Sequence, residues 1–104
     1  MSDLEKKLLT TLALMVVKVR RACGHDTVRL ETFLKNQDID VLRALTVLYY
    51  LGRPDETYGT FEEGWTDVAI ERYYDFSADD CVRKLIENTV DVVEEYFKYG
   101  ISKL

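Results

Sequence analysis

Residues that break helices are scarce in this chain, and they stand between segments of helical periodicity. Proline occurs once, at Pro54, and glycine five times in 104 residues. Breakers of this kind separate regular elements, and between them apolar side chains recur at three- and four-residue intervals. No run alternates in the way that a half-buried strand does. The pattern predicts an all-α fold, a compact bundle of about five helices.

The first two helices are predicted from their ends. Ser2 and Glu5 form a capping box ahead of a helix over about residues 3–22, and Gly24 stops it. A shorter helix over about residues 27–35 is expected next. In the first helix the main apolar stripe is expected to face the core; it comprises Leu8, Leu12, Met15, Val16 and Val19.

A third helix, over about residues 39–51, is expected at the centre of the fold. Asp38 is a good N-cap for it, and Gly52 followed by Pro54 gives a strong C-terminal signal. Its apolar residues lie on nearly every side. A helix of that kind is usually buried on all faces.

Two longer helices are predicted for the second half of the chain. Thr60 caps the first of them, which runs to about Phe76, and Ser77 with Asp80 caps the second. The apolar stripe of the last helix ends at Gly100.

The length of the chain limits its organisation. A chain of 104 residues has enough apolar surface for one core and too little for two, so residues 1–104 are expected to form a single domain. No apolar run reaches the length of a membrane span, and we expect no membrane partner. Cys23 and Cys81 belong to no Cys-x-x-Cys pair. Reduced thiols and a cytoplasmic location are expected, with a single disulfide as the alternative.

Negative charge is concentrated in the second half of the chain. The net charge is -5, but the residues after Gly52 carry thirteen acids against six Lys and Arg. Between Asp55 and Asp80 the only cation is Arg72. Four acids in this stretch stand at successive i, i+4 positions of the predicted helix and would form one ridge, at a cost of about 0.2 to 0.5 kcal/mol for each like-charged pair. They are Glu63, Asp67, Glu71 and Asp75.

The functional hypothesis is a non-catalytic module whose acidic helical face docks on a basic surface of a partner protein. One version is a phage or mobile-element inhibitor, of the anti-CRISPR or DNA-mimic type, that blocks a nucleic-acid machine. The plainer alternative is that the ridge is only a solvated face. The candidate partner-binding residues are Asp55, Glu56, Tyr58, Glu62, Glu63, Asp67, Glu71, Tyr74, Asp75, Asp79 and Asp80.

Two other function classes stay open. The first helix also carries Leu9, Ala13 and Val17 outside its main stripe, so a structural protein that forms a homodimer through this helix is one alternative. A carboxylate-dependent hydrolase is another, because acids are plentiful, although the sequence singles out no reactive pair.

Motifs for other chemistry are missing. The sequence has no phosphate-binding glycine loop, no paired-cysteine zinc pattern and one histidine, His25. We therefore expect no cofactor and no metal. Direct binding of nucleic acid is disfavoured by the net acidity and by a third helix whose one cation is Arg43.

Part of the sequence resembles a known bacterial family. Residues 42–68 read LRALTVLYYLGRPDETYGTFEEGWTDV, and residues 94–104 read EEYFKYGISKL. This resembles a family of small uncharacterised helical domains in which an apolar helix ends in a Gly-Arg-x-Asp turn. Gly52, Arg53 and Asp55 match that turn, while Pro54 replaces a glycine of the family pattern. The resemblance implies a helical fold and implies no site.

Overall fold

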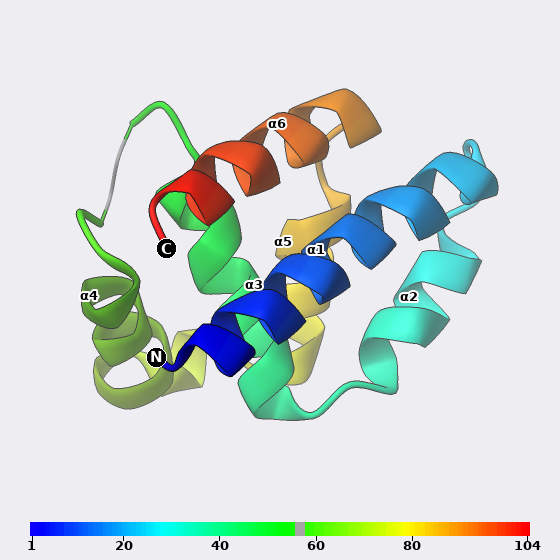
Figure 1. Ribbon diagram of the computed structural model, residues 1–104. Helices are drawn as coiled ribbons and strands as arrows, with labels where there is room; N and C mark the ends of the chain where they lie inside the picture. The colour runs from blue at the N-terminus through cyan, green and yellow to red at the C-terminus, as the bar shows by residue number, and fades with distance from the viewer. Residues whose placement is uncertain (56–57) are drawn as a thin grey trace.

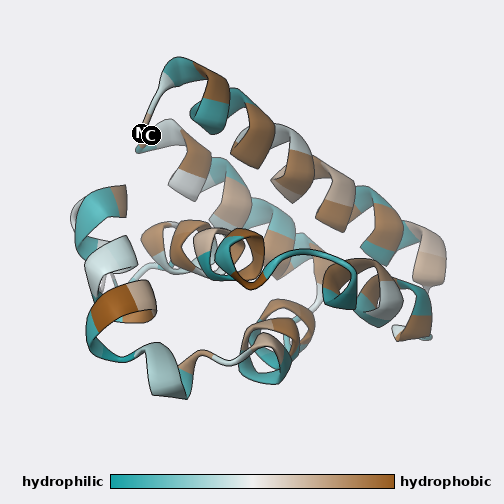
Figure 2. Ribbon diagram, turned by 90° about the horizontal axis from the view of Figure 1, so that it is seen from below, coloured by the Kyte–Doolittle hydropathy of each residue, from teal (hydrophilic) through white to brown (hydrophobic). Residues whose placement is uncertain are grey.

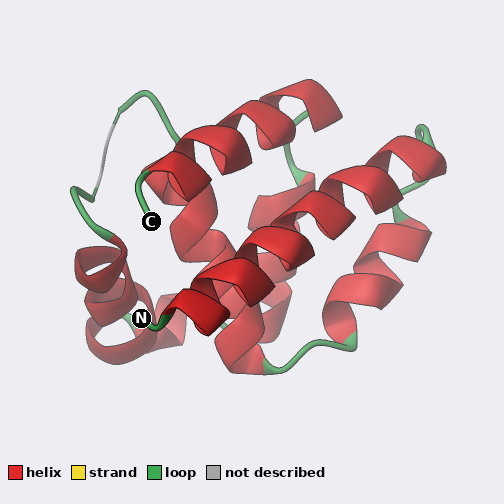
Figure 3. Ribbon diagram, in the orientation of Figure 1, coloured by secondary structure: helices red, strands yellow, loops and turns green. Residues whose placement is uncertain are grey.

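The helix at the centre of the molecule is α3, Ile39–Leu51, and the other helices pack around it (Figure 1). The computed structural model describes residues 1–55 and 58–104, which are helical with connecting loops and contain no strand (Figure 3). Seven residues of α3 are buried, and the hydroxyl of Thr46 donates a hydrogen bond to the Leu42 carbonyl at 2.8 Å. The prediction of a central apolar helix is confirmed.

The ends of α1, Asp3–Cys23, are those that the sequence predicts. The hydroxyl of Ser2 accepts a hydrogen bond from the Glu5 amide at 3.1 Å, and the Glu5 carboxylate accepts one from the Ser2 amide at 3.2 Å. Gly24 ends the helix with φ of +61°, a conformation that favours glycine. The short helix α2, Val28–Lys35, follows.

The face of α1 that is buried differs from the predicted stripe. Leu9, Ala13, Val16 and Val17 pack into the core, whereas Leu8 and Met15 of the predicted stripe are exposed. The prediction is wrong in this respect because α1 carries apolar residues on two faces, and only one of them meets the core. Figure 2 shows the alternation of hydrophobic and hydrophilic residues along the helices.

The helix predicted from Thr60 to Phe76 is three short pieces. They are α4, Phe61–Trp65, the π-helical η1, Thr66–Glu71, and the 3-10 helix η2, Tyr73–Asp75. At the end of η1 the Arg72 amide donates to the Asp67 carbonyl at 2.7 Å, an i→i+5 bond. Arg43 of α3 holds the last turn, because its guanidinium donates to the carbonyls of Tyr73 and Phe76 at 3.2 and 3.0 Å.

The last predicted helix is two helices, α5, Ala78–Ile86, and α6, Val90–Ser102, so the described part of the chain holds six α-helices instead of about five. Asn88 lies in the break. Its carbonyl accepts a hydrogen bond from Arg20 of α1 at 3.3 Å, and its amide group donates to the hydroxyl of Tyr49 of α3. Contacts with two other helices therefore fix a turn that periodicity does not reveal.

Two glycines allow α3 and α6 to touch backbone to backbone. A Cβ added to Gly100 would lie 2.2 Å from the Leu48 carbonyl oxygen, and one added to Gly52 would lie 1.6 Å from that of Tyr96. Gly100 therefore stands inside α6 as a packing residue, two residues before the helix ends at Ser102.

Both cysteines, Cys23 and Cys81, are free thiols in the structure. Among the described residues, no helix has the length and apolar character needed to cross a bilayer.

Candidate partner-binding site

The predicted ridge of four carboxylates does not form. Glu63 lies in α4, Asp67 and Glu71 lie in η1, and Asp75 lies in η2. A π-helix places i→i+5 residues in register, and the chain leaves helical geometry at Arg72, where φ is -115° and ψ is 33°. Positions four apart are therefore no longer stacked, and the ridge prediction is wrong.

Asp67 is engaged inside the protein. Its two carboxylate oxygens accept hydrogen bonds from Arg72, Nε at 2.8 Å and Nη2 at 2.6 Å, and the hydroxyl of Tyr58 also donates to it. The Arg72 guanidinium holds the pKa of Asp67 below its ordinary value. Arg72 neutralises this carboxylate, so Asp67 is a structural residue and adds little to an acidic surface.

Tyr58 was expected to be exposed, and it is 7% exposed. Burial first, and then the neighbouring Asp67, raise the pKa of Tyr58 to about 12. The phenol is therefore protonated at neutral pH and serves as a donor to Asp67. The expected exposed role of Tyr58 is wrong, because its ring packs against Tyr50 with centroids 6.3 Å apart.

Three other predicted residues also make local contacts. Glu63 accepts a hydrogen bond from the Gly59 amide at 3.1 Å, and Asp80 completes the capping box of α5 with Ser77. Asp55 is paired with Arg53 at 3.2 Å. Glu56 lies outside the described residues. These carboxylates are occupied in shaping the turns and helix ends.

Five predicted residues are exposed and take no side-chain part in this network, in two places. Glu62 lies in α4 near the amino terminus of the chain. The other four fall in the segment from Ile70 to Asp79, together with exposed Ile70 and Tyr73, which were not among the predicted binding residues. We call the exposed acidic and large apolar residues of this segment the acidic edge; they are Ile70, Glu71, Tyr73, Tyr74, Asp75 and Asp79, and the exposed cation Arg72, which pairs with Asp67, lies among them.

The acidic edge presents apolar surface beside negative charge. Ile70, Tyr73 and Tyr74 are 61%, 56% and 68% exposed, and the two tyrosine rings meet edge to face at 5.8 Å. Glu71 and Asp79 are exposed and form no ion pair with any described residue. The exposure of Tyr74 meets a requirement of its predicted binding role, and Tyr73 is exposed beside it. In the sequence, the capping box of Ser77 and Asp80 indicates that the preceding helix has to end before Ser77.

No family model, no curated protein and no solved structure matches this chain. The family resemblance therefore stays an expectation, and the candidate site rests on geometry alone.

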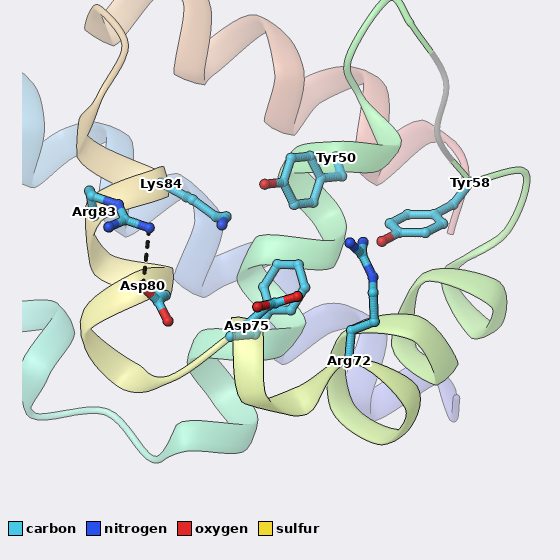
Figure 4. A pocket seen from close by; sticks show the side chains of 8 residues that line it. Tyr50, Tyr58, Arg72, Asp75, Asp80, Arg83 and Lys84 are labelled. Carbon is cyan, nitrogen blue, oxygen red and sulfur yellow. Dashed lines mark hydrogen bonds and ion pairs between the residues drawn. The ribbon is translucent and has the colours of Figure 1, made fainter.

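A cleft of about 410 Å³ lies between the acidic edge and α5 (Figure 4). The ring of Phe76 is its floor, with Lys84 Nζ 4.8 Å and the Arg72 guanidinium 5.5 Å from the ring centroid. Asp75 lines the cleft as well, beside the Asp80–Arg83 ion pair at 3.1 Å. Positive and negative groups alternate here, so the cleft selects for neither sign of charge. Asp75 is thereby shared between this cleft and the outer surface.

Proposed function

We propose that the protein is a non-catalytic binding module that docks on a basic surface of a partner protein through the acidic edge. The observation that carries the proposal is the exposed pair Tyr73 and Tyr74, flanked by Glu71 and Asp79, which form no ion pair with any described residue. Tyrosine side chains bury a large area at a small cost in conformational entropy, and they are enriched at the centres of protein interfaces.

The charge of the edge supports a basic partner. Glu71 and Asp79 flank the two tyrosines in sequence and stay in solvent, where they attract cationic surfaces over distances of about 8 Å at physiological salt. Aromatic contacts at the centre with charge at the rim are the usual arrangement of a transient interface. Association is then expected to weaken as salt rises.

The DNA-mimic version of the hypothesis has less support than the general one. It depended on carboxylates one helical turn apart, similar in spacing to phosphates along a strand. Asp67 is neutralised by Arg72, and the helix that would have carried the row is broken. The broader proposal, that this protein inhibits a partner by occupying a basic groove on it, does not require a regular row of charges.

The proposal is tested by quantitative affinity capture from a lysate of the source cells. One edge variant carries Tyr73→Ser and Tyr74→Ser, and a second carries Glu71→Gln and Asp79→Asn. We expect each to lower recovery of a basic partner at least about tenfold, equivalent to about 1.4 kcal/mol.

The matched controls change the same residue types elsewhere on the surface. Tyr99→Ser removes a tyrosine that is 57% exposed on α6, and Glu87→Gln with Glu95→Gln removes two exposed carboxylates. Both controls should recover the partner as the unchanged protein does. Equal recovery of the same partners by edge and control variants would remove the proposal.

A further inference from the structure

A second surface, separate from the acidic edge, is an apolar groove of about 640 Å³. It lies between the first half of α1, the first half of α3, and α4, which adjoin one another in Figure 1. The side chains that form its apolar lining include Leu8, Leu12, Val41, Ala44, Phe61 and Trp65.

The wall of the groove on α4 is a stacked aromatic pair. Phe61 and Trp65 are one turn apart, with centroids at 6.2 Å and ring planes within 13° of each other. Each ring is only partly buried. Gly64, between them, fixes α4 close to α3, because an added Cβ would lie 2.6 Å from Val47. The wall is therefore held in place while one side of it stays open.

Every charged side chain that lines the groove is acidic. They are Glu5 of α1, Asp40 of α3 and Glu62 of α4, one from each element. Asp40 and Glu62 are exposed, and the one cation at the rim is the amino terminus, 3.8 Å from Glu62. The groove is thus an apolar floor with a negative rim.

The apolar surface continues out of the groove along α1. Leu4 and Leu8, one turn apart, are 67% and 57% exposed. No described residue covers this continuation. The open apolar surface therefore has room for a long element, such as a helix that follows several turns of α1.

We propose that this groove binds an amphipathic, cationic helix of a partner protein. Apolar side chains at i, i+3 or i+4 and i+7 of such a helix would enter the groove, and Lys or Arg on its flanks would meet the exposed carboxylates of Asp40 and Glu62, while Glu5 also serves the capping box of α1. The inference rests on the proposed function in one respect, that the partner is basic. None of the groove residues belongs to the acidic edge.

A second copy of this chain fits the groove less well than a cationic helix. Two copies each carry a net charge of -5 and would bring the same three carboxylates together. The exposed first half of α1 offers no excess of positive charge in return, because Lys6 and Lys7 are balanced by Asp3 and Glu5. Complementarity of charge therefore selects a foreign, basic helix.

The probe for this site is a synthetic peptide of leucine and lysine about 18 residues long, or five helical turns, with its leucines on one face. Trp65 is the only tryptophan of the chain and lines the groove, so its fluorescence reports occupancy directly. We expect a blue shift of Trp65 emission and calorimetric binding at least about tenfold tighter than that of a peptide with the same composition in scrambled order. A peptide with glutamate in place of lysine should not bind.

Variants on α1 locate the binding. Leu8→Lys puts a cation into the groove at an exposed position and should weaken the peptide at least about tenfold. Leu14→Lys is the control, because Leu14 is 46% exposed on another face of α1 and does not line the groove. It should leave binding within about twofold of the unchanged protein. Circular dichroism of both variants verifies that α1 stays folded.

Variants at the rim test the charge. Asp40→Asn with Glu62→Gln should weaken the peptide and reduce the dependence of its affinity on salt. The control pair Glu87→Gln and Glu95→Gln, remote from the groove, should change neither.

Three results would overturn the inference. The Trp65 spectrum could stay unchanged at millimolar peptide, or the scrambled or glutamate peptide could bind equally well. The third is a concentration-dependent dimer of this chain that Leu8→Lys dissociates.

The edge variants separate this inference from the proposed function, because Glu71→Gln with Asp79→Asn should leave peptide binding intact. Peptide binding without edge-dependent capture would support the groove alone, and the reverse result would support the edge alone.

Discussion

The helix α3 and the segment from Phe61 to Phe76 have comparable length, and the sequence predicts one uninterrupted helix for each. The first forms as expected, whereas the second is divided among α-helical, π-helical and 3-10 geometry. After its exposed first turn, α3 has buried apolar residues on most sides, so burial stabilises the rest of the helix. The segment from Phe61 onward has few buried side chains, and individual polar contacts decide its course.

Those polar contacts come from two arginines. Arg72 binds Asp67 within the segment, and Arg43 reaches from α3 to the Tyr73 and Phe76 carbonyls. The comparison teaches that similar sequence signals can end in different geometries. Burial holds α3 in one helix, whereas Arg72 and Arg43 hold the more exposed segment in three shorter pieces.

The largest effect is expected at the contact between α3 and α6. Gly100→Ala should lower the free energy of unfolding by about 3 kcal/mol, because the new methyl meets a backbone carbonyl that no side-chain rotation can relieve. Urea denaturation measures the loss.

Gly64→Ala, in α4, tests the other region in the same way as Gly100→Ala tests α6. Its methyl would meet the side chains of Val47 and Tyr58, which adjust more easily than backbone, so a loss of about 1 kcal/mol is expected. A loss at Gly64 equal to or larger than that at Gly100 would contradict the view that α3 and α6 form the more tightly fitted region.

The Arg72 network should give an intermediate effect. Arg72→Gln removes both charge-assisted hydrogen bonds to Asp67, and we expect the free energy of unfolding to fall by about 1 kcal/mol at neutral pH. The side chains of Tyr73 and Tyr74 should also become less ordered, which nuclear magnetic resonance of the tyrosine rings can detect.

The same variant has a defined pH dependence. The pKa of Asp67 is lowered in the folded protein, chiefly by Arg72, so its ionised form adds stability above its ordinary pKa of 3.8 and loses that contribution as the pH falls through the lowered value. The difference in stability between the unchanged protein and Arg72→Gln should therefore be full above about pH 5 and shrink below about pH 4. A difference that is constant from pH 7 to about pH 2 would exclude Asp67 as the partner that matters.

The last comparison is between two helix starts, one of which should show the smallest effect. Ser77→Ala removes a side chain that accepts from the Asp80 amide at 3.2 Å, and should cost about 1 kcal/mol. Asp38→Ala should cost about 0.3 kcal/mol or less, because the Asp38 side chain makes no capping bond to α3. Equal losses in thermal denaturation would show that Asp38 caps α3 in solution.

Local signals in the sequence predicted much of the fold. Ser2 with Glu5, and Gly24 with its positive φ, placed the ends of α1 within a residue. The break at Asn88 was missed, because the contacts that hold it come from Arg20 and Tyr49, far away in the chain. The role of Gly100 was missed for a similar reason, since a close approach between two helices leaves no local signal.

The exposure of the candidate residues was predicted in part, while their role in binding stays a prediction. Glu71, Tyr74 and Asp79 are exposed, as a binding surface requires, but Tyr58 and Asp67 are turned into the protein by Arg72. Sequence spacing alone could not tell the exposed residues from the engaged ones, because both groups consist of tyrosines and acids in the same acidic stretch. The groove beside α4 was not predicted, since its lining comes from three helices distant in sequence.

The glycine contact between α3 and α6 has a consequence for hydrogen exchange. Backbones that touch at Leu48 and Gly100 cannot separate without opening the core, so their amides should exchange only through global unfolding. The amides from Thr66 to Asp75, with few buried neighbours, should exchange through local opening at much lower free energy. The protein thus has a part that should resist opening and a flank that should open locally while the rest stays folded.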